Sequence, residues 1–419
     1  MRERPVAKGF CAVRPRWGFS PTLILPLMAG EKRGLGIAKR LPLHLSGPLL
    51  HMRVMSGRID VLYHVRSDAR SIDGRAKGIA IEQSVEMPVE PIEDPFVLEE
   101  TVGRVESIED IGGGTFAVRI GLAAITTGMR PGQLLNMLFG NTSLQDDTVL
   151  VDATFPPDFA DAFKGPHHGL DGLRARVGAK GALSCSALKP QGSSPRALAM
   201  IAARMTQGGI DYIKDDHGIA DQSYSPFAER VPAIADAVAT EAAKTGVPTR
   251  YFPSLSGNLD DMRKQIALAR DCGLDGVLIA PMLVGVDQFC TLKTENPDFA
   301  FLGHPTLGGV RITQSFLLGK LFRLLGADAT IFPNYGGRFG NSKELCLSLA
   351  DGARQPWMGL KPTMPVPAGG MTLDRVPEML EFYGTEVMLL IGGSLLSTKE
   401  RLPQETARYV EAVRSFGNG

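Results

Sequence analysis

The chain has 419 residues, 44% hydrophobic and 21% charged, which is typical of a globular protein and excludes a disordered or fibrous one. Its 45 lysines and arginines balance its 45 aspartates and glutamates, so no bulk charge predicts a nucleic-acid partner. The five cysteines form no CxxC pair, which favours a reducing, cytoplasmic location over a zinc site or a disulfide framework. The apolar run from Leu23 to Met28 is too short to span a bilayer, so we expect no membrane partner.

Residues 1–52 are basic, with nine lysines and arginines against Glu3 and Glu31. An arginine-rich targeting leader and a basic nucleic-acid arm are both possible interpretations of this composition. We favour a third, in which residues 1–52 are a disordered extension or translation starts at Met52 or Met55. The first convincing strand follows directly after this segment.

Residues 53–152 are predicted to form a small α+β domain. Alternation of apolar and polar residues indicates four strands here. They are expected at Ile59–Val65, Gly78–Gln83, Thr101–Ile108 and Thr115–Gly121.

The sequence pattern is different in residues 153–419, where a unit of one strand and one helix repeats from Gly181 onward. Eight short apolar runs are typical of buried parallel strands: Leu183–Leu188, Ile210–Ile213, Pro248–Phe252, Gly276–Ala280, Phe299–Leu302, Ala329–Phe332, Met364–Val366 and Val387–Ile391. Helical patterns follow them at Ser194–Gln207, Pro226–Lys244, Leu259–Cys272, Val286–Leu292, Ile312–Leu325, Ser342–Gly352, Leu373–Tyr383 and Pro403–Phe416. Such alternation predicts an α/β protein with a C-terminal (β/α)8 barrel. A doubly wound sheet is the competing arrangement, but no GxGxxG follows any strand.

Polar residues cluster at the predicted strand ends, where barrel enzymes carry their active sites. Lys189 follows the first strand, Lys214-Asp215-Asp216-His217 ends the second, and His304 ends the fifth. Gly369-Gly370 and Gly392-Gly393 follow the seventh and eighth strands, where barrels commonly bind phosphate through backbone N–H groups. This pattern indicates an enzyme that acts on a phosphorylated small molecule.

The same segments resemble the RuBisCO large-chain family over roughly residues 56–416. The motifs that carry the resemblance are Gly208-Gly-Ile-Asp-Tyr-Ile-Lys-Asp-Asp-His-Gly, Phe163-Lys-Gly-Pro-His-His-Gly, Leu188-Lys-Pro-Gln, Gly140-Asn141 and the two Gly-Gly turns. The resemblance implies an α+β N-terminal domain before the barrel, in agreement with the pattern of predicted elements.

Site residues can be carried over from the family position by position. Lys214 matches a lysine that is carbamylated to bind Mg²⁺, Asp216 matches a metal-binding aspartate, and His217 stands where a glutamate completes the metal site. The resemblance makes Lys189 the residue that handles enolisation protons and His304 a further active-site residue. Glu82 and Asn141 match residues that reach the neighbouring subunit's site, which implies a homodimer or a multiple of dimers. Gly369, Gly370, Gly392 and Gly393 match the phosphate site.

The departures from the family are equally informative. Gln191 replaces a second active-site lysine and Pro305 replaces the arginine of the second phosphate site. Phe332 replaces a substrate-binding histidine and Ala368 a serine, and Arg338 is the nearest substitute for the lysine of the mobile loop. One phosphate site is kept and the other is lost. The chain therefore resembles a RuBisCO-like protein (form IV) and is not expected to carboxylate ribulose bisphosphate.

Three reactions of this family fit the retained residues, because in each a divalent cation stabilises an enediolate of a phosphorylated keto-sugar. They are decarboxylation of 3-oxo-isoapionate 4-phosphate, enolisation of a diketo methylthiopentyl phosphate, and isomerisation of methylthioribulose phosphate. We favour decarboxylation, because it yields the enediolate without a second general base, and Gln191 cannot act as one. The Lys-Asp-Asp-His-Gly variant also resembles the subgroup linked to that pathway. Gln191 and either Arg311 or Arg338 are then expected to contact the sugar acid.

A non-catalytic role in sulfur metabolism or stress is the alternative of a different class. The loss of several substrate contacts is compatible with it. Lys189, Lys214 and Asp216 argue for an enzyme, because a scaffold does not require them. Ligand binding that depends on magnesium and bicarbonate would discriminate between the two classes.

Overall fold

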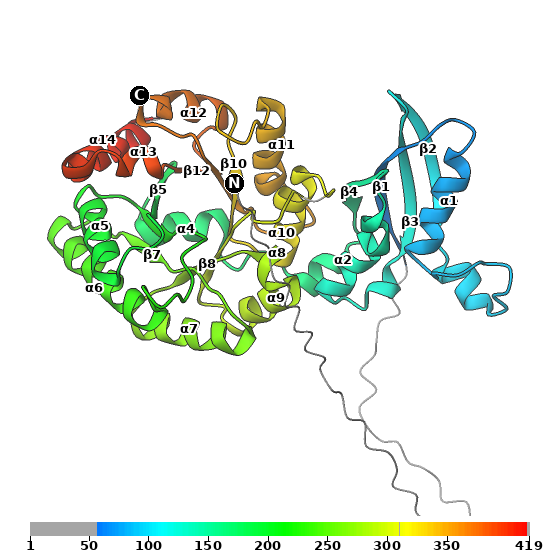
Figure 1. Cartoon of the computed structure of the whole chain (residues 1–419), viewed down its shortest axis with the longest axis horizontal. Helices are drawn as coiled ribbons and strands as arrows, with labels where there is room; N and C mark the ends of the chain where they lie inside the picture. Colours follow the sequence, from blue (N-terminus) through cyan, green and yellow to red (C-terminus); the bar gives the residue numbers. More distant parts are fainter. Residues whose placement is uncertain (1–56, 310, 417–419) are drawn as a thin grey trace, which may run out of the picture. The chain divides into compact units, whose positions relative to one another are not determined.

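The computed structural model describes residues 57–309 and 311–416 (Figure 1). Residues 57–154 contain a four-stranded antiparallel sheet in the order β2-β3-β1-β4. Alternate residues of β1, from Ile59 to Val65, are buried, so one face of the sheet packs on a core while the other faces outward. The strands are β1 (Arg58–Arg66), β2 (Arg104–Gly112), β3 (Thr115–Ala123) and β4 (Thr148–Thr154), with helices α1 (Ile72–Glu82) and α2 (Pro131–Phe139).

The strand predicted at Gly78–Gln83 is wrong, because this segment ends helix α1. The side chains that the helix buries are Ile72, Ala76, Ile79 and Ala80, which share one helical face. Over a segment of only six residues, apolar Ile79 and Ile81 two positions apart resemble the alternation of a strand. Packing of this apolar face on the sheet outweighs the low helix propensity of the glycines.

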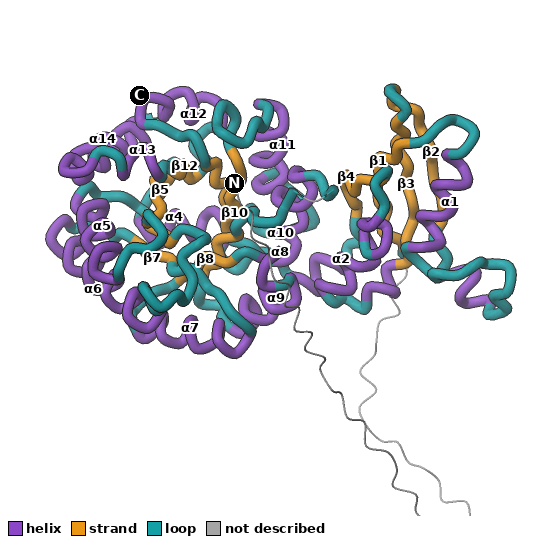
Figure 2. Tube along the Cα trace, in the orientation of Figure 1, coloured by secondary structure: helices purple, strands orange, loops and turns teal. Residues whose placement is uncertain are grey.

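Eight parallel strands form the barrel, in the order β7-β6-β5-β12-β11-β10-β9-β8. A bridge between Ser254 and Leu278 joins the two end strands and closes the ring. Figure 2 shows the strands at the centre with helices around them. The sequence prediction of a small α+β domain followed by a (β/α)8 barrel is confirmed. The strands are β5 (Leu183–Leu188), β6 (Tyr212–Asp215), β7 (Arg250–Phe252), β8 (Gly276–Ile279), β9 (Ala300–Gly303), β10 (Ala329–Pro333), β11 (Met364–Ala368) and β12 (Met388–Leu390).

The helices after residue 154 lie close to the predicted ranges. The predicted helix at Ile312–Leu325 is instead a π-helical segment, Ser315–Leu321, that continues into α10 (Phe322–Leu325). The others are α3 (Asp158–Phe163), α4 (Gly169–Val177), α5 (Pro195–Gln207), α6 (Phe227–Thr245), α7 (Leu259–Asp271), α8 (Pro281–Val284), α9 (Val286–Glu295), α11 (Lys343–Arg354), α12 (Val376–Tyr383), α13 (Gly393–Leu396) and α14 (Leu402–Ser415). Short 3-10 or π turns lie at Val97–Thr101, Ala124–Thr127, Asn141–Leu144, Leu373–Arg375 and Lys399–Arg401.

Residues 1–52, the subject of the first prediction, lie outside the described part of the chain. The domain limits at 52/53 and 152/153 stay predictions. In the described ranges, none of the helices combines the length and the apolar character that crossing a membrane requires.

Candidate functional site

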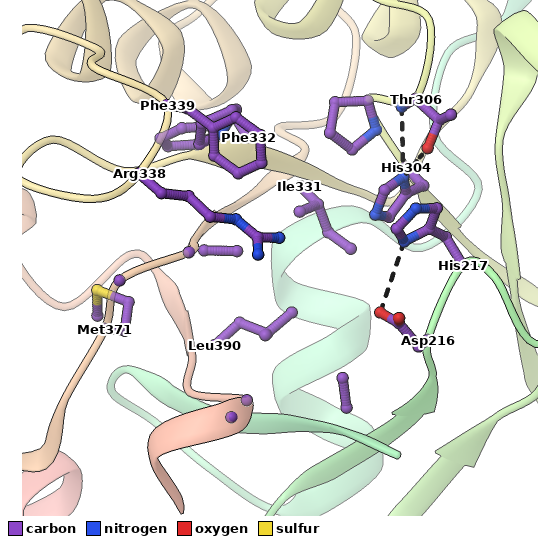
Figure 3. Close-up of a pocket in the computed structure, with 18 of the residues that line it drawn as sticks. Asp216, His217, His304, Thr306, Ile331, Phe332, Arg338, Phe339, Met371 and Leu390 are labelled. Atoms are coloured by element: carbon purple, nitrogen blue, oxygen red, sulfur yellow. Dashed lines mark hydrogen bonds and ion pairs between the residues drawn. The ribbon is translucent and has the colours of Figure 1, made fainter. Parts of the chain in front are cut away.

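A pocket of about 780 Å³ lies at the carboxyl ends of the barrel strands (Figure 3). The strands are parallel, so the residues that follow each of them converge on this one rim. Ten of the residues predicted from the sequence line it: Lys189, Lys214, Asp216, His217, His304, Arg338, Gly369, Gly370, Gly392 and Gly393. The structure therefore brings together most of the predicted site.

Lys189 and Asp216 form an ion pair at the floor of the pocket. Lys189 Nζ lies 2.6 Å from Asp216 Oδ2. Burial alone would raise the pKa of the Asp216 carboxyl, but its interactions with His217 and Lys189 outweigh burial and hold that pKa well below its usual range. The carboxylate is thus ionised at any physiological pH. A methyl group at Gly392 would lie 3.7 Å from Lys189 Cε, so the lysine stem passes beside the second glycine turn.

Lys214 is a buried lysine whose side chain reaches the pocket from β6. Only 3% of the residue is exposed, and Nζ donates a hydrogen bond to the Asp215 carbonyl at 2.9 Å. Burial lowers the pKa of its amine, although the nearby Asp216 charge opposes this shift. A lowered pKa increases the fraction of neutral amine, which is the form that reacts with carbon dioxide.

His217 and His304 stack on each other at the pocket wall (Figure 3), with ring centroids 4.2 Å apart and an interplanar angle of 17°. The Thr306 hydroxyl lies 2.5 Å from His304 Nδ1, and the Thr306 N–H donates to the same nitrogen at 3.3 Å. Burial, with smaller contributions from Lys214 and His217, lowers the pKa of His304 to about 2. The ring is therefore neutral near pH 7. Its Nδ1 accepts from Thr306, so Nε2 carries the proton.

The side chains around Asp216 fit a divalent cation on one condition. Asp216 supplies a carboxylate oxygen and His217 an imidazole nitrogen. In the described ranges, no three His, Cys, Asp or Glu side chains are grouped so as to hold a metal ion. A third donor would come from Lys214 if its buried amine, whose pKa burial lowers, carried a carbamate. With that modification two of the three donors would be the oxygen ligands that hard cations prefer, and His217 would supply a nitrogen.

The first glycine turn contacts both the loop of the second turn and the loop that carries Arg338. Ser394 Oγ donates to the Met371 carbonyl at 2.8 Å and so joins the loop after β12 to the loop after β11. A methyl group at Gly370 would lie 2.5 Å from the Gly337 Cα, so the loop that carries Arg338 packs directly on the first glycine turn. Arg338 points into the pocket (Figure 3), with its guanidinium 4.9 Å from the centroid of the Phe339 ring.

One side of the pocket is apolar. Pro305 and Phe332, which replace two polar residues of the resembled family, both line it, and further apolar side chains join them: Leu307, Leu318, Ile331 and Phe339. Phe332 is buried. These six residues, the apolar wall, can receive an uncharged group, and their own side chains offer no partner to a second phosphate, although the Arg338 guanidinium lies against the Phe339 ring.

Three predicted site residues do not line the described pocket. Gln191 Nε2 donates to the Gly218 carbonyl at 2.5 Å and so connects the loops after β5 and β6. Glu82 and Asn141 lie in the N-terminal domain, where Asn141 Nδ2 donates to Glu82 Oε1 at 2.8 Å. Arg311, the alternative cation, pairs with Asp146 at 3.3 Å and is not among the residues that line the pocket.

The sequence reasoning missed several pocket residues. Thr306, which contacts the His304 ring, lies only two residues after it in the sequence. Ile331 and Leu390 are strand residues that point into the barrel, and only knowledge of strand direction reveals this. Phe339 follows Arg338 in a loop without regular pattern, and no sequence signal identifies it.

Residues 173–398 match the family described as ribulose bisphosphate carboxylase large chain, catalytic domain. The chain is 56% identical over 362 residues to a 5-methylthioribulose-1-phosphate isomerase of Rhodospirillum rubrum, covering 86% of this chain and 97% of the relative. It is 28% identical over 360 residues to a 2,3-diketo-5-methylthiopentyl-1-phosphate enolase of Geobacillus kaustophilus, covering 80% and 86%.

A solved structure gives the same assignment. The crystal structure of a Rubisco-like protein from Rhodopseudomonas palustris superimposes with a TM-score of 0.81 at 50% identity, covering 87% of this chain and 99% of that one. Fold, site residues and sequence agree. The chain belongs to the RuBisCO large-chain family, as one of its RuBisCO-like (form IV) members.

Proposed function

We propose that the protein isomerises 5-methylthioribulose 1-phosphate, a ketose with one phosphate and a thioether. The apolar wall carries this proposal. Pro305 replaces the arginine of the family's second phosphate site and Phe332 replaces a substrate-binding histidine, and both line the pocket, which therefore suits a substrate with one charged end and one apolar end. The relative from Rhodospirillum rubrum, which acts on that ketose by name, supports the same choice. The earlier expectation of decarboxylation gains no support from these relatives.

Each end of the substrate would have its own binding region. Backbone N–H groups at Gly369-Gly370 and Gly392-Gly393 would hold the phosphate, with the Arg338 charge beside them. The methylthio group would lie against Phe332, where burial of an apolar group of this size contributes about 1–2 kcal/mol.

The reaction requires a proton to leave the carbon next to the ketone and another to reach the former carbonyl carbon. Lys189 would move these protons, since it lines the pocket and its amine pairs with Asp216. The neutral His304 would donate its Nε2 proton in a hydrogen bond to a substrate oxygen as negative charge develops there. Carbamylated Lys214, Asp216 and His217 would hold Mg²⁺. The cation, when bound, supplies Lewis-acid stabilisation of the enediolate.

We also propose that the protein works as a homodimer or a multiple of dimers. Glu82 and Asn141 are hydrogen-bonded to each other, although 59 residues separate them in sequence. They do not line this chain's pocket in the described structure, so a second copy is the natural place for them to act.

Incubation with 5-methylthioribulose 1-phosphate, Mg²⁺ and bicarbonate in D₂O tests the proposed function. We expect a product isomer with one deuterium at carbon, measured by NMR, and at least tenfold lower kcat/KM with ribulose 1-phosphate, which lacks the thioether. Parallel reactions contain the diketo-methylthiopentyl phosphate and 3-oxo-isoapionate 4-phosphate. Faster turnover of either one, with no isomer formed from the first, would replace this proposal by enolisation or decarboxylation.

The close packing of the first glycine turn predicts a specific binding defect. In Gly370→Ala, a methyl group 2.5 Å from the Gly337 Cα forces the loops apart, so we expect KM for the phosphorylated substrate to rise at least tenfold. Gly246→Ala is the matched control. Its φ of 71° equals the 72° of Gly370 within a degree, and a methyl group there meets nothing within 4 Å. Both variants should lose about 1 kcal/mol through backbone strain. An equal KM in the two variants would show that the turn does not bind phosphate.

A further inference from the structure

Asp215 stands between two proposed metal-site residues, yet its side chain does not line the pocket. It is the last residue of β6, and none of its surface is exposed. The proposed chemistry gives this carboxylate no task. A buried carboxylate is costly unless other groups satisfy it, so its partners indicate what it does.

Three groups from neighbouring elements meet the Asp215 carboxylate. The Tyr251 hydroxyl on β7 donates to Oδ1 at 2.8 Å, and the Ser254 N–H donates to Oδ2 at 3.0 Å. Arg230 Nε, on α6, lies 3.3 Å from Oδ2, and the Arg230 side chain is likewise fully buried. Arg230 is fixed in turn by a 2.6 Å hydrogen bond to the Ser225 carbonyl. The carboxylate thus joins β6 to both β7 and α6.

The backbone of the same residue connects this cluster to the pocket. The Asp215 carbonyl accepts the hydrogen bond of Lys214 Nζ at 2.9 Å. The next residue, Asp216, pairs with Lys189 at 2.6 Å. A shift of the Asp215 backbone would therefore move both Lys214 and Asp216.

A buried ion pair is seldom retained for stability alone, because apolar residues of the same volume usually give an equal or more stable core. We propose that Arg230 and Tyr251 are positioning residues. They hold the Asp215 carboxylate and so fix the end of β6 that presents Lys214 and Asp216 to the pocket. Misplacement of reacting groups by about 1 Å can lower a rate by about 100-fold, so a fixed strand end matters for turnover.

Two tyrosine variants test this role. Tyr251→Phe removes only the hydroxyl that binds Asp215. Tyr212→Phe is the matched control on β6 itself, since its buried hydroxyl donates to the Leu173 carbonyl at 2.7 Å and does not contact Asp215. Both changes delete one buried hydrogen bond, and Tyr251→Phe should lower the unfolding temperature more, because its partner is a buried carboxylate and that of Tyr212 is a neutral carbonyl.

Kinetics and crystal structures of the full chain separate positioning from stability. The kinetic measurement rests on the proposed isomerisation. We expect Tyr251→Phe to lower kcat at least tenfold with KM changed less than twofold, and Tyr212→Phe to keep kcat within twofold. In the crystal, Lys189 Nζ and Asp216 should leave hydrogen-bonding distance in Tyr251→Phe and stay paired in Tyr212→Phe.

The inference is overturned if Tyr251→Phe keeps the kcat of the wild type, or if Lys189 and Asp216 stay paired in its crystal structure. If the wild type does not turn over the ketose, the proposed function fails. The positioning role is then tested only by whether Lys189 and Asp216 stay paired in the crystal structures of the two variants. If Tyr251→Phe does not fold, Arg230→Lys is measured in the same way. It keeps the buried positive charge but loses the reach of the guanidinium, and we expect the same tenfold loss of kcat.

Discussion

Lys189→Met is expected to lower kcat for isomerisation by about 10³-fold and to leave the unfolding temperature almost unchanged. The methionine keeps the apolar stem that passes beside Gly392 and removes only the amine that can move a proton. The Lys189 side chain is 35% exposed, so its ion pair with Asp216 contributes little to folding. Deuterium exchange at carbon, followed by NMR, measures the lost step directly.

The control for this variant lies at the opposite end of the same strand. Lys180 is exposed and precedes β5, whereas Lys189 follows it, so Lys180→Met removes an equal charge away from the pocket. Activity of this control should match the wild type. If Lys189→Met still exchanges deuterium at more than a tenth of the wild-type rate, another group moves the proton.

Lys214→Met is expected to abolish turnover, with a loss of at least about 10³-fold, and also to abolish the binding of Mn²⁺ as a spectroscopic substitute for Mg²⁺. The fully buried amine carries the proposed carbamate, and a thioether cannot replace it. The unfolding temperature should fall, as in any variant that leaves a buried carbonyl unpaired, because the Asp215 carbonyl loses the hydrogen bond from Lys214. Electron paramagnetic resonance of free Mn²⁺ in bicarbonate buffer measures the binding.

Lys293 provides the matched control for a buried lysine. It too is 3% exposed, and burial lowers the pKa of its amine. It donates to the Phe163 carbonyl at 2.9 Å and lies outside the described pocket lining. Lys293→Met should therefore reduce stability by leaving carbonyls unpaired, while Mn²⁺ binding persists. Undiminished Mn²⁺ binding by Lys214→Met would contradict the proposed metal site.

The barrel was predictable because its strands are buried almost throughout and appear as short, mostly apolar runs, as in Gly276–Ile279. Parallel strands also place their following residues on one rim, which allowed Lys189 and His304 to be predicted together. The end of helix α1, predicted as a strand at Gly78–Gln83, was missed because packing against the sheet determines the helix, and a segment of six residues carries no information on that packing.

Side-chain direction limited the prediction of the site. Gln191 follows Lys189 by two residues and was expected to meet the substrate, but its amide turns toward the Gly218 carbonyl. The argument for decarboxylation rested on the absence of a second base at Gln191, and the position of this amide outside the pocket lining does not distinguish decarboxylation from isomerisation. Of the apolar wall, the sequence indicated only the replacements at Pro305 and Phe332. The loops that supply other residues of the wall have no periodic pattern, so those residues could not be predicted.

The contact between Gly337 and Gly370 restricts which substitutions the two loops can accept during evolution. A methyl group at Gly337 would lie 2.4 Å from the Gly369 carbonyl oxygen, and one at Gly370 would lie 2.5 Å from the Gly337 Cα. Neither position can acquire a side chain unless the facing loop moves with it. Mutations at the two glycines should therefore be strongly non-additive. Substitutions at these positions must therefore be accompanied by changes in the facing loop, which limits the sequence changes that could adapt this pocket to a new substrate.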